Sequence, residues 1–359
     1  MSVHFTMALS IPKTIKQWNV IGNDGSASLK LPEQPVPQFG DSQVLVKLYG
    51  ASLNYRDIMV ARGTYPWAAI PNVIPGSDGA GVVLAVGRHV TRFRPGDKVV
   101  TMLNPKLIGG AITKAIDGFG LGASLDGTFR TAGAFDEAGL VAMPAGLTYA
   151  EAATLSCAGV SAWNALFGLA GRPLSAGHWV LTQGTGGVSV FCVQLAKAVG
   201  ARVVATTSSA EKAELLRRLG ADHVINYRET PEWGVRAKEL TGGIGVDFVV
   251  EVAGPVTMRQ SVESIACDGI MIVMGSVGSG PADKETPDLL DTWMRLFTAR
   301  GIWAGNRFQM EDMGRAIEAN IEKLRPVVDP KVFTLEQLKE AYDYLASGKH
   351  QGNVCIEIS

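Results

Sequence analysis

The segment Gln183-Gly-Thr-Gly-Gly-Val-Ser189 decides the fold of this chain. It follows the apolar run Trp179-Val-Leu-Thr182 and precedes a stretch of helical composition at residues 188–199. A strand, a glycine-rich loop and a helix in this order are typical of a dinucleotide site. Gly184 permits the sharp turn, Gly186 lets a diphosphate approach the backbone, and the free N–H groups of the helix N-terminus bind it. We therefore predict a dinucleotide in contact with Gly184, Gly186, Gly187 and Val188.

The chain beyond this loop repeats the alternation of strand and helix. Apolar strands are expected at 202–206, 223–226, 246–252 and 269–274, and a further helix at 210–219. Continuous apolar strands that alternate with amphipathic helices form a parallel sheet that is covered on both faces. The pattern therefore predicts an α/β fold with a doubly wound, Rossmann-type domain.

The first 150 residues have a different character. Short strands at 43–49, 80–86 and 98–102 are broken by glycine and proline, which predicts a small, irregular β-rich barrel. Near the C-terminus, a helix at 334–345 precedes a strand at 354–358. We expect that last strand to rejoin the first domain.

Composition excludes several classes of protein. The 359 residues carry 33 Lys+Arg and 34 Asp+Glu, so the chain lacks the basic surface that a nucleic-acid binder needs. A hydrophobic share of 47% excludes a disordered chain, and no apolar run approaches the roughly 18 residues of a membrane span. The four cysteines form no CxxC pair, and the N-terminus has no basic signal region. We expect two domains, reduced thiols and a cytoplasmic protein.

The end of the second strand bears on the choice of dinucleotide. NAD sites usually place an acid about 20 residues beyond the loop, where it binds the ribose 2′-OH. Here the strand ends in Thr207 and Ser208, with Lys212 in the next helix, and these groups are able to bind a 2′-phosphate. Tyr227, after the third strand, is expected beside the adenosine ribose. We predict NADP(H) rather than NAD(H), although Lys212 also fits an ordinary solvated helix position.

Several further motifs carry a family resemblance. They are Asn54-Tyr-Arg-Asp57, Arg62-Gly-Thr-Tyr-Pro66, Pro75-Gly-Ser-Asp-Gly-Ala-Gly81, Gly96-Asp-Lys-Val99 and Leu219-Gly-Ala-Asp-His-Val-Ile-Asn-Tyr227. In this order and spacing the chain resembles the medium-chain dehydrogenase/reductase superfamily over nearly its whole length. The resemblance implies a GroES-like catalytic domain at 1–150 and 305–359, a Rossmann NADP(H)-binding domain at 151–304, and a homodimer.

The resemblance also bears on metal binding. Zinc alcohol dehydrogenases of this superfamily hold a catalytic zinc with a Cys, a His and a second Cys, and the matching positions here are Asn54, Ser77 and Cys157. A catalytic zinc needs about three protein ligands, and only Cys157 is retained. Residues 101–127 contain no cysteine for a structural zinc. We therefore expect no metal and the greatest similarity to the quinone oxidoreductase and enoyl reductase branch.

Three catalytic residues are implied by the resemblance. Tyr65 matches a proton donor of related enoyl reductases, and Asn54 replaces a zinc ligand beside the nicotinamide, where it would orient substrate or cofactor. Asp57 follows on the same helix face. A packing role for Tyr65 and a helix N-terminal charge for Asp57 remain open.

The remaining cofactor contacts lie at strand ends and in the tail. Ser161 matches a family threonine at the nicotinamide, with an ordinary helix serine as the alternative, and Asn353 stands where family members often carry lysine. Parallel sheets bind ligands at the carboxyl ends of their strands. The expected backbone contacts there are Val252, Ala253, Gly275, Ser276 and Val277.

The expected function is reduction without a metal. A C=C bond conjugated to a carbonyl, or a quinone, accepts hydride from NADPH more readily than a simple carbonyl that no metal polarises. The alternatives are a zinc-independent aldehyde or ketone reductase and a cofactor-binding protein with little turnover. An apolar cleft lined by Trp67, Phe119, Trp303 and Phe308, under a lid at 108–126, would take an apolar substrate.

Overall fold

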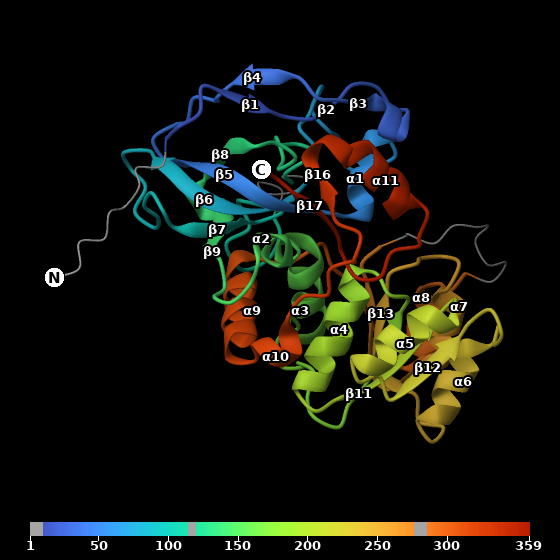
Figure 1. The fold of residues 1–359 in the computed structure, drawn as a ribbon. Helices are drawn as coiled ribbons and strands as arrows, with labels where there is room; N and C mark the ends of the chain where they lie inside the picture. Colours follow the sequence, from blue (N-terminus) through green and yellow to red (C-terminus); the bar gives the residue numbers. More distant parts are fainter. Residues whose placement is uncertain (1–9, 114–119, 276–285) are drawn as a thin grey trace.

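The computed structural model describes residues 10–113, 120–275 and 286–359. Two sheets organise them, and Figure 1 shows one above the other with helices between and around them. The lower sheet contains the glycine-rich loop predicted to bind a dinucleotide. Among the described residues, no helix is long and apolar enough to cross a membrane.

The six-stranded sheet is wholly parallel and confirms the predicted Rossmann fold. Its order is β12-β11-β10-β13-β14-β15, so the chain starts at the centre and reverses direction beside the first strand. The strands are β10 (Trp179–Gln183), β11 (Arg202–Thr207), β12 (His223–Asn226), β13 (Val246–Glu251), β14 (Ile265–Val273) and β15 (Thr298–Gly301). The helices that accompany them are α4 (Gly187–Ala198), α5 (Ala210–Arg218), α6 (Trp233–Leu240), α7 (Met258–Ser264) and α8 (Leu289–Arg295).

The seven-stranded sheet belongs to the GroES-like part and is built from both ends of the chain. Its path runs β16-β17-β5-β6-β7-β9, with β8 also paired to β5. β17 runs antiparallel to β5, with Val354 opposite Leu53, so the last strand rejoins the first part of the chain as predicted. The strands are β5 (Gln43–Leu53), β6 (Asp78–Val86), β7 (Lys98–Thr101), β8 (Ala132–Asp136), β9 (Leu140–Ala142), β16 (Phe333–Thr334) and β17 (Val354–Glu357).

Short elements complete this part of the molecule. Two small antiparallel ladders join β1 to β4 and β2 to β3. The bounds are β1 (Thr14–Lys16), β2 (Asn19–Val20), β3 (Leu29–Lys30), β4 (Glu33–Pro35), α1 (Tyr55–Ala61), α11 (Leu338–Ala346) and the 3-10 turns η1 (Gly25–Ser28), η2 (Glu137–Gly139) and η4 (Leu335–Gln337). The tail helix predicted at 334–345 therefore begins as a 3-10 turn.

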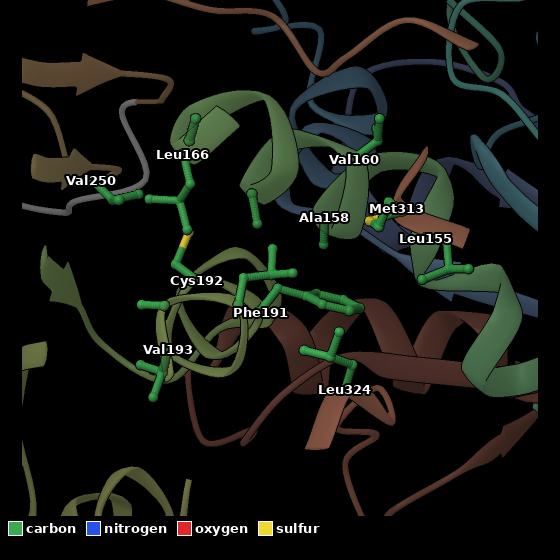
Figure 2. Packing of buried hydrophobic residues seen from close by; sticks show 14 of the residues in the cluster. Leu155, Ala158, Val160, Leu166, Phe191, Cys192, Val193, Val250, Met313 and Leu324 are labelled. Atoms are coloured by element: carbon green, nitrogen blue, oxygen red, sulfur yellow. The ribbon is translucent and has the colours of Figure 1, made fainter. Parts of the chain in front are cut away.

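A layer of helices joins the two sheets. It consists of α2 (Tyr149–Ala153), the π turn η3 (Leu155–Gly159), α3 (Val160–Phe167), α9 (Arg307–Ala319) and α10 (Ile321–Leu324). α2 packs against β5 and β6, whereas α3 packs against α4 and α9. Figure 2 shows Phe191 of α4 facing Ala158 and Leu324, in one buried cluster that reaches from Val100 of β7 to Val250 of β13. This continuous apolar packing holds the two sheets in a fixed relation around the site.

Candidate active site

The glycine-rich loop has the geometry that its sequence requires. Gly184 has φ of +74°, which an L side chain rarely adopts, so glycine is needed there. A Cβ atom at Gly187 would lie 2.2 Å from the Asn353 Oδ1 atom, so the loop and the C-terminal segment are in direct contact. The Gly352 N–H donates to the Thr185 carbonyl at 2.8 Å. The C-terminal segment therefore forms one wall of the loop.

An open cavity of about 530 Å³ lies above this loop. Its lining joins the carboxyl ends of β10, β11, β12 and β13 to the segment between α11 and β17. Most of the predicted cofactor residues meet here, namely Gly184, Gly186, Gly187, Val188, Ser208, Lys212, Tyr227, Val252 and Asn353. These residues and this volume fit a dinucleotide.

One end of the cavity is cationic. The Lys212 Nζ atom donates to the Gly348 carbonyl at 2.5 Å, and both burial and the nearby Arg228 lower the pKa of Lys212. Burial and Lys212 together lower the pKa of His350 to about 4. Arg228 and His350 also line the cavity but were not predicted. Arg228 could have been predicted, because it directly follows Tyr227, which was expected beside the adenosine ribose. His350 could not, because it is far from the loop in sequence and reaches the cavity only through tertiary folding.

Two predicted contacts, Thr207 and Ala253, do not line either cavity, and two more lie outside the described residues. Thr207 is fully buried and does not line the cavity. The backbone N–H of Ala253 donates to the side chains of Gln183 and Glu251, at 3.3 and 3.0 Å. Because β10 and β13 are neighbours, this network joins the ends of the two strands that flank the cofactor loop. Ser276 and Val277 lie outside the described residues.

A second cavity of about 440 Å³ continues from the first. The two share Asn54, Tyr55, Val188 and Val252, so together they form one cleft between the two sheets. The predicted residues Tyr65, Ser161 and Gly275 line this second part, as do Trp67, Trp303, Arg56, Cys157, Met59 and Leu103. We call this second cavity the aromatic cleft.

Two of the proposed cleft residues are not confirmed. Phe308 is 54% exposed and is not among the residues that line the cleft. Phe119 and the middle of the proposed lid, residues 114–119, lie outside the described residues. Of the four aromatic residues expected to line the cleft, Trp67 and Trp303 do so.

Aromatic rings form one wall of the cleft. The ring centroids of Tyr65 and Trp67 are 5.3 Å apart, and those of Trp67 and Trp303 are 5.5 Å apart. The Tyr65 hydroxyl oxygen accepts hydrogen bonds from Arg56 Nε at 3.3 Å and from Trp303 Nε1 at 3.4 Å. A phenol accepts two hydrogen bonds and donates one. With both acceptor positions used, the proton of Tyr65 is left for a group in the cleft.

Asn54 and Asp57, at the start of α1, differ in whether they line the cleft. Asn54 is the N-cap and lines both cavities. Asp57 is fully buried, and its carboxylate accepts from the Asn54 N–H at 2.8 Å and from Arg56 Nη1 at 3.2 Å. Asp57 is not a lining residue of either cavity. The geometry thus gives Asp57 a capping and charge-balancing position and leaves Asn54 in the cleft.

The donor set does not suit a catalytic zinc. At the three matching positions stand an amide, a hydroxyl and a thiol, and the Ser77 hydroxyl is engaged by the Asp78 carboxylate at 2.6 Å. Within residues 10–113, 120–275 and 286–359, no three His, Cys, Asp or Glu side chains form a metal-binding group.

Comparisons with known proteins agree with this architecture. Residues 40–145 match the alcohol dehydrogenase GroES-like domain, and residues 187–319 match the zinc-binding dehydrogenase family. A zinc-type alcohol dehydrogenase-like protein of Schizosaccharomyces pombe is 42% identical over 336 residues, which cover 93% of this chain and 96% of that protein.

Two solved structures show the range of cofactors among similar folds. An NAD-dependent alcohol dehydrogenase superposes with a TM-score of 0.84 at 30% identity, covering 96% of this chain and 100% of that one. A crotonyl-CoA carboxylase/reductase in complex with NADP has a TM-score of 0.84 at 25% identity, covering 97% and 96%. The fold, the cleft and these matches lead to one conclusion: the chain belongs to the medium-chain dehydrogenase/reductase superfamily of oxidoreductases.

Proposed function

We propose that this protein is an NADPH-dependent reductase of conjugated C=C bonds or quinones that works without a metal. The observation that supports this most is the hydrogen bonding of Tyr65. Two N–H donors occupy its oxygen, so its proton faces a cleft that is continuous with the cofactor cavity. A polarised carbonyl oxygen is the partner that such a donor suits.

The cationic end of the cofactor cavity supports NADPH. Lys212 and Arg228 stand beside Ser208 and Tyr227, where an NAD site usually carries an acid. A 2′-phosphate there gains charge-assisted hydrogen bonds, whereas the 2′-OH of NADH does not. In this proposal the nicotinamide lies near Asn54, which lines both cavities, and Ser161, which lines the aromatic cleft.

Bound NADPH would supply a hydride to the β-carbon of the substrate, and the electron pair of the C=C bond would move toward the carbonyl oxygen. The residues of this chain then act on that oxygen. Tyr65 donates a hydrogen bond to it and is the source of the proton that completes the reduction, and solvent restores the tyrosine proton. The rings of Tyr65, Trp67 and Trp303 exclude water and hold a flat, apolar substrate.

The absence of a suitable zinc donor set supports the choice of substrate class. A simple aldehyde needs strong polarisation of its oxygen, which zinc provides in the metal-dependent branch. A conjugated system spreads the same negative charge over more atoms, so its carbonyl oxygen needs less polarisation by the protein. Reduction of an aldehyde or ketone is the second candidate, because the Tyr65 hydroxyl would also bind that oxygen.

A substrate panel separates the candidates. Purified protein is mixed with NADPH and, in turn, an enone, a quinone and an aldehyde of similar size, and NADPH oxidation is followed by absorbance. Turnover with the enone or the quinone supports the proposal. Turnover with the aldehyde alone makes the protein a carbonyl reductase, and NADPH binding without turnover makes it a cofactor-binding protein.

We also propose that the chain forms a homodimer. α8 presents Leu289, Trp293 and Met294 to solvent, at 84%, 71% and 70% exposure. The adjacent strand β15 is the last in its sheet, and within the described residues no strand pairs with its outer edge. An open strand edge beside an exposed apolar helix is a surface that a second copy of the chain would cover.

A further inference from the structure

Arg56 is buried in the wall of the aromatic cleft. It is the second residue of α1 and is only 9% exposed. Its Nε atom donates to Tyr65 and its Nη1 atom donates to Asp57. Its Nη2 atom is also buried and has no hydrogen-bond partner among the residues that the structure describes. Proteins rarely bury a cation in this way without a use for it, because an unpaired charged donor is costly.

Arg56 carries a positive charge that lies at the wall of the aromatic cleft. Arg56 stays cationic in spite of its burial, because a guanidinium is effectively always protonated in proteins and the Asp57 carboxylate lies 3.2 Å from its Nη1 atom. Asp57 is fully buried and lies outside the cleft, whereas Arg56 lines it. The ion pair is therefore a dipole whose positive end faces the aromatic cleft.

This positive end lies against Tyr65. The guanidinium carbon is 4.9 Å from the centre of the Tyr65 ring, and Nε is within hydrogen-bond distance of the hydroxyl oxygen. Trp303 donates to the same oxygen from the segment that follows β15. The hydroxyl is thus held from both sides of the cleft, and its orientation depends on Arg56.

We propose that Arg56 is a positioning residue that directs the Tyr65 hydroxyl toward the carbonyl oxygen of the substrate and, through that hydroxyl, stabilises the negative charge that develops there. The proposal rests on the proposed function.

A kinetic experiment separates this role from a purely structural one. Arg56→Gln alone strands the buried Asp57 carboxylate, so the working variant combines Arg56→Gln with Asp57→Asn. We expect it to lower kcat on an enone about 10- to 100-fold and to change the KM for NADPH less than about twofold. Arg56→Lys, which keeps the charge, should recover part of the loss.

The decisive measurement repeats the Arg56→Gln/Asp57→Asn change in protein that also carries Tyr65→Phe. If Arg56 acts through Tyr65, the combined variant should be no slower than Tyr65→Phe alone. An equal fold-loss in both backgrounds overturns the proposal. Arg130→Gln is the matched control, since Arg130 is also a buried arginine, packed over Phe135 and outside the cleft. It should leave the kcat unchanged in folded protein.

A binding experiment makes the inference independent of turnover. 4-Nitrophenolate, which carries negative charge on an oxygen attached to a flat ring, is titrated into the protein without cofactor, with nitrobenzene as the uncharged comparison. We expect the Arg56→Gln/Asp57→Asn variant to bind the phenolate about tenfold more weakly and nitrobenzene equally well. Equal losses for both ligands overturn the proposal. If the wild type reduces no enone, the proposed function fails, yet this titration still decides the role of Arg56.

Discussion

The indole nitrogen of Trp303 donates a hydrogen bond to the hydroxyl oxygen of Tyr65 at 3.4 Å. Tyr65 follows α1 in the GroES-like part of the chain, and Trp303 follows the last strand of the Rossmann sheet. The contact therefore joins the two parts of the molecule at the point where substrate would lie. The position of the proposed proton donor depends on how the two parts pack together.

Replacement of Tyr65 tests its role as the proton donor. Tyr65→Phe should lower kcat on an enone by roughly 10² to 10⁴, the usual contribution of a general acid, and leave NADPH affinity nearly intact. Steady-state kinetics and a cofactor titration measure the two effects. Tyr49→Phe is the control, because Tyr49 stacks on Tyr149 away from the cleft. An unchanged kcat in Tyr65→Phe would assign the proton to water or to another residue.

Replacement of Lys212 tests the choice of cofactor. Lys212→Ala should weaken NADPH binding about tenfold and barely change NADH binding, since a hydrogen bond to a charged group is worth roughly 1.5–3 kcal/mol and solvent reduces this. The loss should shrink at high salt. Arg228 and Ser208 remain in the cavity, so some preference for NADPH should persist. Titrations of both cofactors measure it, and equal losses would show that Lys212 supports the fold and not the phosphate.

Much of this arrangement was predictable from local sequence, and the reasons are physical. The strands between Trp179 and Val273 could be predicted because both of their faces are buried, which makes their sequences continuously apolar. The position of Gly184 could be predicted because the turn after the first of these strands needs a positive φ. Arg56 and His350 were missed as site residues because their place depends on contacts between segments far apart in the chain. Packing also decides that Thr207 is buried and that Asp57 caps α1. Neither position could be predicted from the residue type alone.

Asp78 gives the protein a predictable pH dependence. Burial raises the pKa of this carboxyl from 3.8 to about 7. Hydrogen bonds from Ser77 and Asn54 and the charge of Arg56 oppose this shift, and the charge of Asp57 adds to it. Between these two values the folded protein binds a proton that the unfolded chain does not, so the contribution of Asp78 to stability falls as pH rises through this window. Asp78→Asn should therefore gain stability over the wild type on going from about pH 5 to about pH 8. The gain is at most about 3 kcal/mol, because about two pH units separate pH 5 from the folded pKa and each is worth ~1.4 kcal/mol.

Denaturant unfolding at the two pH values measures this difference. Asp343→Asn, at an exposed aspartate on α11, serves as the control and should show no such trend. A stability gap between Asp78→Asn and wild type that does not change with pH would show that Asp78 is already ionised in the folded protein.

The exposed face of α8 predicts the assembly state. Wild-type protein should sediment at twice the 38.0 kDa mass of one chain, and Trp293→Asp should shift it toward the monomer. Ile244→Asp is the matched control, because Ile244 is 73% exposed in a loop that is not part of α8 or β15. A wild type that sediments only as a monomer at micromolar concentration contradicts the proposal.

The most direct test of the proposed function combines metal content with turnover. The protein is dialysed against a chelator, its zinc is determined by elemental analysis, and oxidation of NADPH and of NADH is followed with an enone and a quinone. We predict turnover with NADPH well above that with NADH, in protein that holds far less than one zinc per chain. About one zinc per chain together with loss of activity on its removal, or turnover that prefers NADH, would contradict it.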